Sequence, residues 1–357
     1  MKTTTYTFTT LDDPLANDGT FAEGINDADQ IVGYYSQSTG AGTNNYGFVY
    51  SGSYTTIDVP LSNGTFTGGI NDQGQIVGYY RDAHSNFHGF LYSGGSYTTI
   101  DDPNNPQDSV SVGINNKGQI VGDYIEPDPS AIGHGYLYSH GTFTTLDVPG
   151  SSANQATAIN DKGDIVGFYN DSITGVEHGY LYSHGTYTTL DDPAGTFTKP
   201  QGINNKGQIV GDYIDSSGHM NGFIYDHGSF TTIDDPLGQG VETTVVTGIN
   251  DQGQIVGWYN DGSNNGNASI HGFIANPVQA GPNAASTNGV VADTFVFAPS
   301  SGYAMSAVVP AIQNPQAQLA DALHAVVGTG VTHEVNDAIT TTVVHASNPH
   351  VSDFHLS

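Results

Sequence analysis

One short motif returns at a nearly constant interval along most of the chain. Ile-Asn, followed a few residues later by Gln-Ile-Val-Gly or Asp-Ile-Val-Gly, begins at six positions spaced 45, 44, 45, 44 and 46 residues apart, namely Ile25, Ile70, Ile114, Ile159, Ile203 and Ile249. A fixed period of roughly 20–50 residues is typical of repeat proteins, in which one unit cannot bury its apolar faces without its neighbours. Most of the chain is therefore six copies of one supersecondary unit.

Each unit predicts four short strands. The first ends at Ile-Asn, and a tight turn such as Asn71 to Gly74 follows, with an Asx residue at its start and a glycine where a positive φ is needed. Segments of the type QIVGYY, HGFLY and SYTTID provide the other three strands, and a variable loop rich in Asp, Asn and Ser separates the second from the third. Four antiparallel strands in about 40–45 residues match one blade of a β-propeller.

The two ends of the repeated region complete each other. The segment from Thr5 to Pro14 has the sequence of a fourth strand without the first three, and the last unit stops after its third strand, His271 to Pro277. We therefore predict an all-β fold over residues 1–277: a six-bladed β-propeller of four-stranded antiparallel blades, closed by pairing the N-terminal strand with the last blade. Such closure leaves no exposed sheet edge.

These motifs resemble a known family. The pattern of IN..GQIVG, then His-Gly-Phe-Leu-Tyr, then TTLD, is similar to the HAF repeat, a bacterial extracellular repeat named after its His-Ala-Phe signature. Here glycine replaces the alanine throughout, and Tyr46 and Asn221 replace the histidine in the first and fifth units. The resemblance implies the repeat fold and an extracellular location. It implies no catalytic residues, because the family has no agreed activity.

Charge narrows the range of partners. The chain has 35 acidic and 6 basic residues and a formal net charge of −29, which disfavours nucleic acid and anionic lipid as partners. Cations are favoured, and calcium is the cofactor that we expect if one is bound. The chain has no cysteine for disulfides and no apolar run of the ~20 residues that a membrane span needs. We expect a monomer.

The C-terminal part differs in composition. We predict a linker over residues 278–291 and an extension over 292–357, with a helix that Asn314 caps and that carries Leu319 and Leu323 on one face. The segments DTFVF and SDFH are similar to the C-terminal ends of bacterial calcium-dependent proteins exported by type I secretion. The N-terminus has no apolar stretch of a cleaved signal peptide. We therefore expect a secreted or cell-surface protein that uses this C-terminal route; the acidic composition also fits a cytoplasmic protein of a halophile.

Residues that all units share are expected to be structural. The first aspartate of the Asp-Asp-Pro or Asp-Val-Pro segments (Asp12, Asp58, Asp101, Asp147, Asp191 and Asp234) is expected to cap its turn, and the asparagines after the repeated isoleucine are expected to form turns. Recurring histidines are interpreted as hydrogen-bonded structural residues rather than metal ligands: His88, His134, His178 and His271. The second aspartate recurs in four units and forms either a solvated rim or a cation site: Asp13, Asp102, Asp192 and Asp235.

Residues in which the units differ are the functional candidates. In a propeller, the loops between the second and third strands lie on one face, and such loops on a rigid scaffold often bind ligands. One such loop holds Arg81, the only arginine, with Asp82 and His84, and the next unit places Glu126 there. Arg81 is expected either to pair with Asp82 or to bind a ligand carboxylate. After the repeated Gln-Ile-Val-Gly, the units vary among Tyr34, Tyr79, Asp123, Phe168, Asp212 and Trp258.

Aromatic rings beside carboxylates are what a sugar-binding surface requires, although packing between blades also needs such rings. We therefore predict a carbohydrate-binding module whose ligand contacts are Arg81, Asp82, His84, Asp123, Glu126, Asp212 and Trp258. An enzyme that cleaves polysaccharides with carboxylates or a metal on the same face is the alternative, and catalysis is the less favoured of the two because the unusual residues are spread over several units. A purely structural surface protein is the third possibility.

Overall fold

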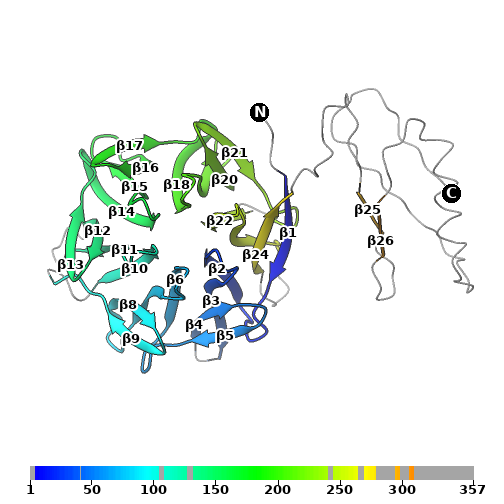
Figure 1. Cartoon of the computed structure of the whole chain (residues 1–357), viewed down its shortest axis with the longest axis horizontal. Coiled ribbons are helices and arrows are strands. Elements are labelled where there is room, and N and C mark those ends of the chain that lie inside the picture. Colours follow the sequence, from blue (N-terminus) through cyan, green and yellow to red (C-terminus); the bar gives the residue numbers. More distant parts are fainter. Residues whose placement is uncertain are drawn as a thin grey trace, which may run out of the picture. The chain divides into compact units, whose positions relative to one another are not determined.

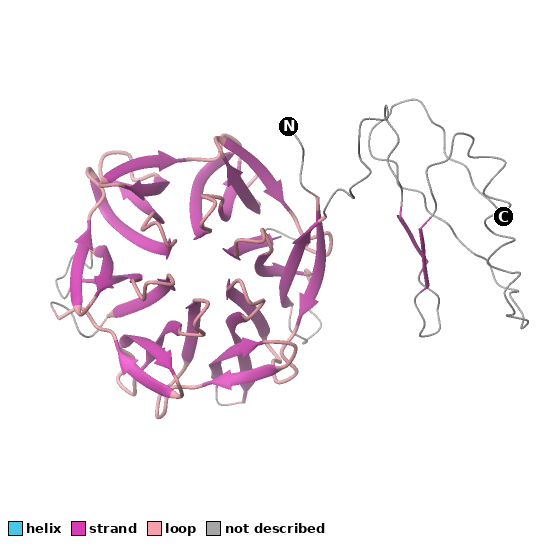
Figure 2. Cartoon of the chain, viewed as in Figure 1, coloured by secondary structure: helices cyan, strands magenta, loops and turns pink. Residues whose placement is uncertain are grey.

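The computed structural model shows six sheets of four antiparallel strands arranged around one axis (Figure 1). It describes residues 5–40, 42–103, 108–126, 132–239, 244–263 and 269–278, together with the backbone of 294–297 and 305–308. No helix occurs in this part of the chain, as Figure 2 shows. The all-β, six-bladed propeller predicted from the repeats is confirmed.

In blades 1 to 5 the strands follow the chain order from the axis outward, and in blade 6 the N-terminal strand β1 takes the outermost place (Figure 1). Blade 1 consists of β2 (Gly19–Ile25), β3 (Ile31–Thr39), β4 (Gly42–Tyr50) and β5 (Tyr54–Ile57). Blade 2 consists of β6 (Thr65–Ile70), β7 (Ile76–Arg81), β8 (Phe87–Ser93) and β9 (Ser96–Thr99). Blade 3 consists of β10 (Ser109–Ile114), β11 (Ile120–Ile125), β12 (Gly133–Ser139) and β13 (Thr142–Leu146).

The second half of the ring repeats this order. Blade 4 consists of β14 (Ser151–Ile159), β15 (Ile165–Asp171), β16 (Glu177–Ser183) and β17 (Thr186–Leu190). Blade 5 consists of β18 (Gly195–Ile203), β19 (Ile209–Asp215), β20 (Met220–Asp226) and β21 (Ser229–Ile233). Blade 6 consists of β22 (Thr244–Ile249), β23 (Ile255–Asn260), β24 (Ile270–Pro277) and β1 (Tyr6–Leu11).

Blade 6 joins the two ends of the repeated region. Strand β1 pairs antiparallel with β24, from Tyr6 opposite Pro277 to Leu11 opposite Gly272. The Phe8 ring lies 5.3 Å from the Phe273 ring between centroids, and Leu11 is buried. The predicted closure is therefore confirmed, and the outer edge of β24 is covered by the N-terminal strand.

The apolar core lies between neighbouring blades. Val32 of blade 1 is fully buried and packs against Ile70 and Ile76 of blade 2, and the valine at the equivalent place in every other unit is also fully buried. The repeated Ile-Val pair puts one aliphatic side chain on each face of the second strand, because successive side chains of a strand alternate. Each blade therefore buries its own apolar surface only when its neighbours are present.

The inner strands approach one another closely around the axis. A Cβ atom on Gly69 would lie 2.8 Å from the Val112 carbonyl oxygen of the next inner strand, and one on Gly24 would lie 2.7 Å from that of Gly68. Each of the six inner strands also has a register shift near this height. A side chain at these positions would collide with the neighbouring backbone, so glycine permits the ring to close.

The chain forms two compact units, Met1–Gln279 and Ala280–Ser357. In the second unit, β25 (Thr294–Phe297) pairs antiparallel with β26 (Met305–Val308). The helix predicted near Leu319 lies outside the described residues, as does most of the predicted extension. Among the described residues, no helix is long and apolar enough to cross a membrane.

Candidate functional site

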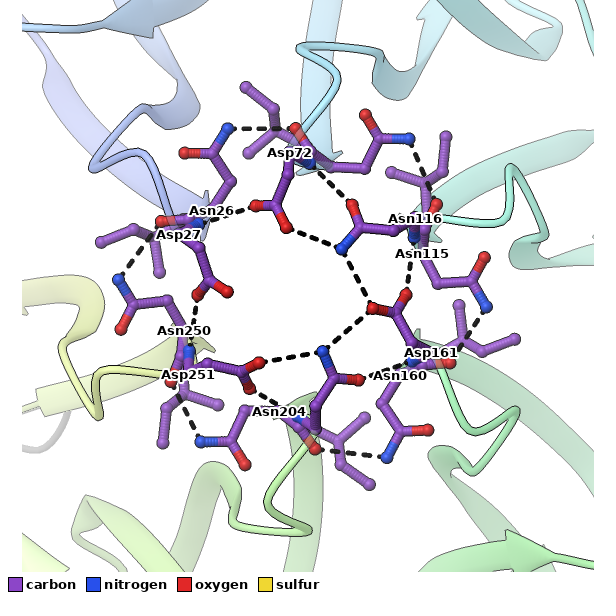
Figure 3. Close-up of a pocket in the computed structure, with 18 residues that line it drawn as sticks. Asn26, Asp27, Asp72, Asn115, Asn116, Asn160, Asp161, Asn204, Asn250 and Asp251 are labelled. Carbon is purple, nitrogen blue, oxygen red and sulfur yellow. Dashed lines mark hydrogen bonds between the residues drawn. The ribbon is translucent and has the colours of Figure 1, made fainter.

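Six equivalent turns surround the axis at one end of the ring (Figure 3). Each begins with the asparagine that follows the repeated isoleucine. Asn71 Oδ1 accepts hydrogen bonds from the backbone N–H groups of Gln73 and Gln75 at 3.1 and 3.0 Å, and Gly74 has the expected positive φ of 72°. These asparagines are therefore turn residues, as predicted.

The same asparagines also join each blade to the next. Asn71 Nδ2 donates to the Asn115 carbonyl oxygen at 3.1 Å, and Asn250 Nδ2 returns to the Asn26 carbonyl oxygen at 3.2 Å. The other four turns make the equivalent bond, so six side chains form a closed circle of hydrogen bonds. The sequence predicted the turns, but these bonds between blades become visible only in the closed ring.

A second circle lies beside the first, one residue later in each turn. We call its members the axial ring: Asp27, Asp72, Asn116, Asp161, Asn205 and Asp251. The backbone N–H of each member donates to the side-chain Oδ1 of the next at 2.7–2.9 Å. Asn116 Nδ2 also donates to Asp72 and Asp161, and Asn205 Nδ2 donates to Asp161 and Asp251 (Figure 3).

Negative charge in the axial ring is least compensated around Asp27. This carboxylate lies between Asp251 and Asp72, where no amide side chain separates the charges. Burial raises the pKa of Asp27, and the charges of Asp251, Asp72 and Asp161 raise it further against the lowering effect of its backbone hydrogen bond. In the described part of the chain, no group of three or more His, Cys, Asp or Glu side chains is arranged to hold a metal ion.

The units diverge in the part of the inner strands nearer to the variable loops. We call the following positions the inner layer: on the innermost strands Phe21, Phe66, Val110, Gln155, Lys199 and Val245, and opposite them on the second strands Tyr34, Tyr79, Asp123, Phe168, Asp212 and Trp258. The predicted residues Asp123, Asp212 and Trp258 thus share one layer, on blades 3, 5 and 6. All three lie on the second strand of their blade.

Aromatic side chains occupy the inner layer of blades 6, 1 and 2. Phe21 stacks on Tyr34 with ring centroids 4.5 Å apart, and Phe66 stacks on Tyr79 at 4.8 Å. Tyr34 meets Phe66 edge-on at 5.0 Å, and Trp258 meets Phe21 edge-on at 5.6 Å. These five half-buried rings form a continuous series, which we call the aromatic arc.

The charged side chains of the inner layer all lie in its opposite half, on blades 3 and 5, with Val110, Gln155 and Phe168 as their uncharged neighbours in the layer. Lys199 Nζ lies 4.8 Å from the centre of the Phe168 ring and 3.4 Å from Glu177 Oε1. The Asp212 carboxylate accepts a hydrogen bond from Gln201 Nε2 at 3.2 Å. Burial raises the pKa of Asp212 to about 6, against the lowering effects of Gln201 and Lys199.

Two further acids in this region have no hydrogen-bond partner among the described residues. Burial raises the pKa of Glu23 to about 8 and that of Asp123 to about 7. Glu23 lies on β2 two residues after Phe21, and its charge contributes to the raised pKa values of Tyr34 and Tyr79. Acids with such pKa values concentrate at functional sites more often than elsewhere.

The loop of blade 2 holds the predicted residues Arg81, Asp82 and His84. Asp82 Oδ1 accepts hydrogen bonds from the backbone N–H groups of His84 and Asn86, which hold the pKa of Asp82 low, at about 2. Arg81 forms no ion pair with Asp82; its Nη2 donates to the Asn63 carbonyl oxygen at 3.2 Å. The prediction of an ion pair between Arg81 and Asp82 is therefore wrong. Arg81 instead links the end of β7 to the connection between β5 and β6, where Asn63 lies.

The recurring histidines are hydrogen-bonded structural residues, as predicted. His88 Nδ1 lies 2.8 Å from Asp101, and His134, His178 and His271 make the same contact with the first aspartate of their own Asp-Asp-Pro or Asp-Val-Pro segment. Glu126, the predicted ligand residue of blade 3, lies 3.4 Å from His134 Nε2. In these four units the first aspartate therefore pairs with a histidine instead of capping the turn as predicted. In the first unit Asp58 accepts from the hydroxyl groups of Ser62 and Thr65.

The second aspartate provides that cap instead. Asp13 Oδ1 accepts from the Leu15 N–H at 2.8 Å, and Asp192 and Asp235 repeat this bond. Asp13, Asp102, Asp192 and Asp235 are all buried, and burial raises the pKa values of Asp13, Asp192 and Asp235. Each belongs to a different connection between blades, and calcium binding by these residues stays a prediction.

Sequence reasoning missed Glu23, Lys199 and Gln201. All three lie on innermost strands, in the part before the repeated isoleucine, where the residues differ from one unit to the next. The available signal was the residue two before the repeated isoleucine, which is Glu23, Gly68, Val112, Thr157, Gln201 and Thr247 in the six units. Only one of these six residues is ionisable.

No family model and no curated protein matches the chain. Among solved structures, a protein described as putative TolB from Agrobacterium tumefaciens is 12% identical with a TM-score of 0.50, over 78% of this chain and 100% of that one. A mutant of AofleA from Arthrobotrys oligospora is 14% identical with a TM-score of 0.48, over 78% and 91%. A fungal lectin from Aleuria aurantia, described as a six-bladed propeller that recognises fucose, is 11% identical with a TM-score of 0.42, over 71% and 90%. At such identities, likeness concerns the fold alone.

Proposed function

We propose that the protein is a carbohydrate-binding propeller whose ligand lies against the aromatic arc. The observation that carries the proposal is the continuous series of half-buried rings from Trp258 to Tyr79. The charge of Glu23 acts on two of these rings, because it contributes to the raised pKa values of Tyr34 and Tyr79. An aromatic ring covers the apolar face of a sugar, and a carboxyl group accepts hydrogen bonds from its hydroxyl groups. Membership of the HAF-repeat family and secretion through the C-terminal extension belong to the same proposal.

The net charge of −29 favours a neutral sugar over an acidic one. The basic side chain of the inner layer, Lys199, is paired with Glu177 and lies near Asp212. Its charge is therefore already compensated. A sugar acid would enter a region in which acidic groups outnumber basic ones, so we expect neutral oligosaccharides to bind best.

The test is an array of defined oligosaccharides, followed by calorimetric titration of the sugar that binds best. Trp258→Ala should weaken binding about tenfold, which corresponds to about 1.4 kcal/mol, because the end of the aromatic arc is removed. Phe168→Ala is the matched control: it removes a ring at the equivalent position of blade 4, outside the aromatic arc, and should change affinity less than threefold. Equal losses in both variants would show that the aromatic arc is not the binding surface, and a wild-type protein that binds no sugar would indicate a structural role.

Cleavage of the bound polysaccharide is the second candidate function. The observation that favours it is that two acids of the innermost two strands, Glu23 on blade 1 and Asp123 on blade 3, have pKa values that burial raises to about 8 and 7, which suit general acids near neutral pH. Incubation of the protein with the polysaccharides that it binds should then release new reducing ends, and Glu23→Gln should abolish the release. Binding without release of any product would exclude this activity and leave the binding function intact.

A further inference from the structure

The loop of blade 2 brings two histidines to one carboxylate oxygen. Asp82 Oδ2 lies 3.5 Å from His84 Nδ1 and 3.6 Å from His88 Nε2, and all three residues belong to the segment 82–88. The other oxygen, Asp82 Oδ1, is occupied by the turn, because it accepts hydrogen bonds from the backbone N–H groups of His84 and Asn86. The oxygen that remains for a ligand is therefore the one that faces both imidazoles.

The separations of these atoms suit ligands of one metal ion. A tetrahedral zinc ion binds imidazole nitrogen and carboxylate oxygen at about 2.0–2.2 Å, which places its ligand atoms about 3.4 Å from one another. A charge-assisted hydrogen bond would be shorter, about 2.7–2.9 Å, so His88 Nε2 makes none with Asp82.

One side chain has to turn before the three groups can surround an ion. As they stand, they are not arranged to hold one. The His84 side chain is 85% exposed, so no packing holds its imidazole in place and a change of rotamer is enough to bring it into position.

His88 is already oriented in the way that metal-binding histidines usually are. Its Nδ1 lies 2.8 Å from Asp101 Oδ2, and its ring stacks on Tyr80 with centroids 5.2 Å apart. A carboxylate on one ring nitrogen fixes the tautomer and leaves the other nitrogen, Nε2, as the ligand atom. Water also reaches this atom: the buried, unpartnered side-chain atoms of the described residues include His134 Nε2 of blade 3 but not His88 Nε2.

Blade 5 contains the same turn with different side chains. Asp215 Oδ1 accepts hydrogen bonds from the backbone N–H groups two and four residues later, as in blade 2. Ser217 and Asn221 stand where blade 2 has His84 and His88. The turn therefore requires histidine at neither position, and the histidine pair of blade 2 is available for another role.

We propose that Asp82, His84 and His88 bind one zinc ion, with its fourth position open to water or to a further ligand. Two imidazoles and one carboxylate are a ligand set that zinc favours, whereas calcium prefers oxygen ligands. The net charge of −29 favours a cation, and the adjacent Arg81 is bound to a carbonyl oxygen of the preceding connection. This site is independent of the carbohydrate-binding function proposed above.

Calorimetric titration with ZnCl2 at physiological ionic strength tests the site, and CaCl2 serves as the comparison. The wild-type protein should bind one zinc ion more tightly than it binds calcium. His88→Asn gives blade 2 the residue that blade 5 has and should weaken zinc binding more than about tenfold. His84→Ser should have a similar effect and leave the melting temperature unchanged, because this side chain is exposed, so loss of a ligand is distinguished from loss of folding.

Blade 5 provides the control and the converse experiment. His219→Asn removes a partly exposed histidine beside Asp215 and should leave zinc affinity unchanged. Ser217→His combined with Asn221→His transfers the histidine pair to blade 5 and should raise the stoichiometry from one zinc ion to two. The zinc site is wrong if the wild-type protein binds no zinc, or if His84→Ser and His88→Asn bind it as tightly as His219→Asn does.

Discussion

The six turns around the axis and the inner layer belong to the same innermost strands: the turns follow these strands, and half of the inner layer lies on them. The two regions differ in how uniform their residues are and in how well their polar groups are paired. In the turns, all six units have the same asparagine, and each of these side chains bonds to its own turn and to the next blade. In the inner layer, the same strands carry Phe21, Val110, Gln155 and Lys199 at equivalent positions. The first region is uniform and satisfied, and the second is varied and partly unsatisfied.

This difference separates what closes the ring from what the ring can bind. A closed ring needs the same contact at every junction, so a residue that makes this contact is repeated in all units. A ligand contacts each blade differently, so residues that bind it have no reason to repeat. The unpartnered carboxyl groups of Glu23 and Asp123 lie in the varied region, where a bound molecule would supply the missing hydrogen bonds.

The largest effect is expected from a substitution in the turns. Asn160 is buried, and its Oδ1 accepts from the N–H groups of Lys162 and Asp164 while its Nδ2 donates to the Asn204 carbonyl oxygen. Asn160→Ala leaves these three groups unpaired and should destabilise the protein by about 3 kcal/mol. The melting temperature should fall by roughly 6–12 °C in calorimetric scans.

Asn221→Ala is the control for this prediction. Asn221 lies on β20, and its Nδ2 makes one exposed hydrogen bond, to the His219 carbonyl oxygen. Its loss should cost less than about 1 kcal/mol. Equal changes in melting temperature for the two variants would mean that the circle of asparagines does not hold the blades together.

A pH series should distinguish the inner layer from the turns. The folded-state pKa of Glu23 is about 8, above its ordinary value of 4.5. Between these values the folded protein retains a proton that the unfolded chain releases, so the contribution of Glu23 to stability is complete below pH 4.5 and is lost as the pH rises through 8. Glu23→Gln removes this loss and should stabilise the protein at pH 8 by about 2 kcal/mol, after allowance for the part of the side chain that water reaches.

Thermal scans from pH 5 to pH 8 measure this difference. At pH 5 the variant and the wild-type protein should melt at nearly the same temperature, and at pH 8 the variant should melt several degrees higher. Asn160→Ala should lower the melting temperature equally at both pH values, because Asn160 does not ionise. A constant difference between Glu23→Gln and the wild-type protein would show that Glu23 is not buried enough to retain its proton.

The strands, the number of blades and the closing pair could all be predicted from the sequence. These features depend on local signals, such as the Asn and Gly residues of the turns and the Ile-Val pairs of the second strands, and repetition multiplies each signal by six. The histidines before the third strand could also be assigned a structural role, and His88 confirms it with its bond to Asp101.

The partners of individual side chains could not be predicted in the same way. The bond from Asn71 to Asn115 crosses between blades, and the contact between Tyr34 and Phe66 depends on how two blades pack. The two aspartates of Asp-Asp-Pro have the same side chain and adjacent positions, so only the backbone direction decides that Asp13 caps the turn and Asp12 pairs with His271. The binding residues named from the sequence stay predictions.

A smaller effect should follow from repairing the axial ring. Three aspartates follow one another in this ring, Asp251, Asp27 and Asp72, with no amide side chain between them. Elsewhere in the ring, Asn116 and Asn205 each donate to two carboxylates. Asp27→Asn should supply the missing amide group and raise the stability at pH 7 by about 1 kcal/mol. The gain should shrink as NaCl screens the repulsion that the substitution relieves.

Calcium binding by the axial ring is the alternative to simple repulsion between its carboxylates, and it predicts a different result. If CaCl2 stabilises the wild-type protein more than NaCl at the same ionic strength, and Asp27→Asn abolishes that extra gain, then the carboxylates around Asp27 bind calcium rather than merely repel one another. Asn205→Asp should act in the opposite direction to Asp27→Asn and lower the stability, because it removes an amide group that bridges Asp161 and Asp251.

The smallest effect is expected at Arg81, which belongs to neither region. Its Nη2 bond to the Asn63 carbonyl oxygen is exposed, so Arg81→Ala should lower the stability by less than about 1 kcal/mol. Arg81 is the last residue of β7, beyond the inner-layer residue Tyr79 of the same strand. Its substitution should therefore not affect the binding of a neutral sugar to the inner layer. A more than tenfold loss of affinity in a calorimetric titration, with an unchanged melting temperature, would instead place the ligand on the loops and identify Arg81 as the partner of an acidic group, as the sequence first suggested.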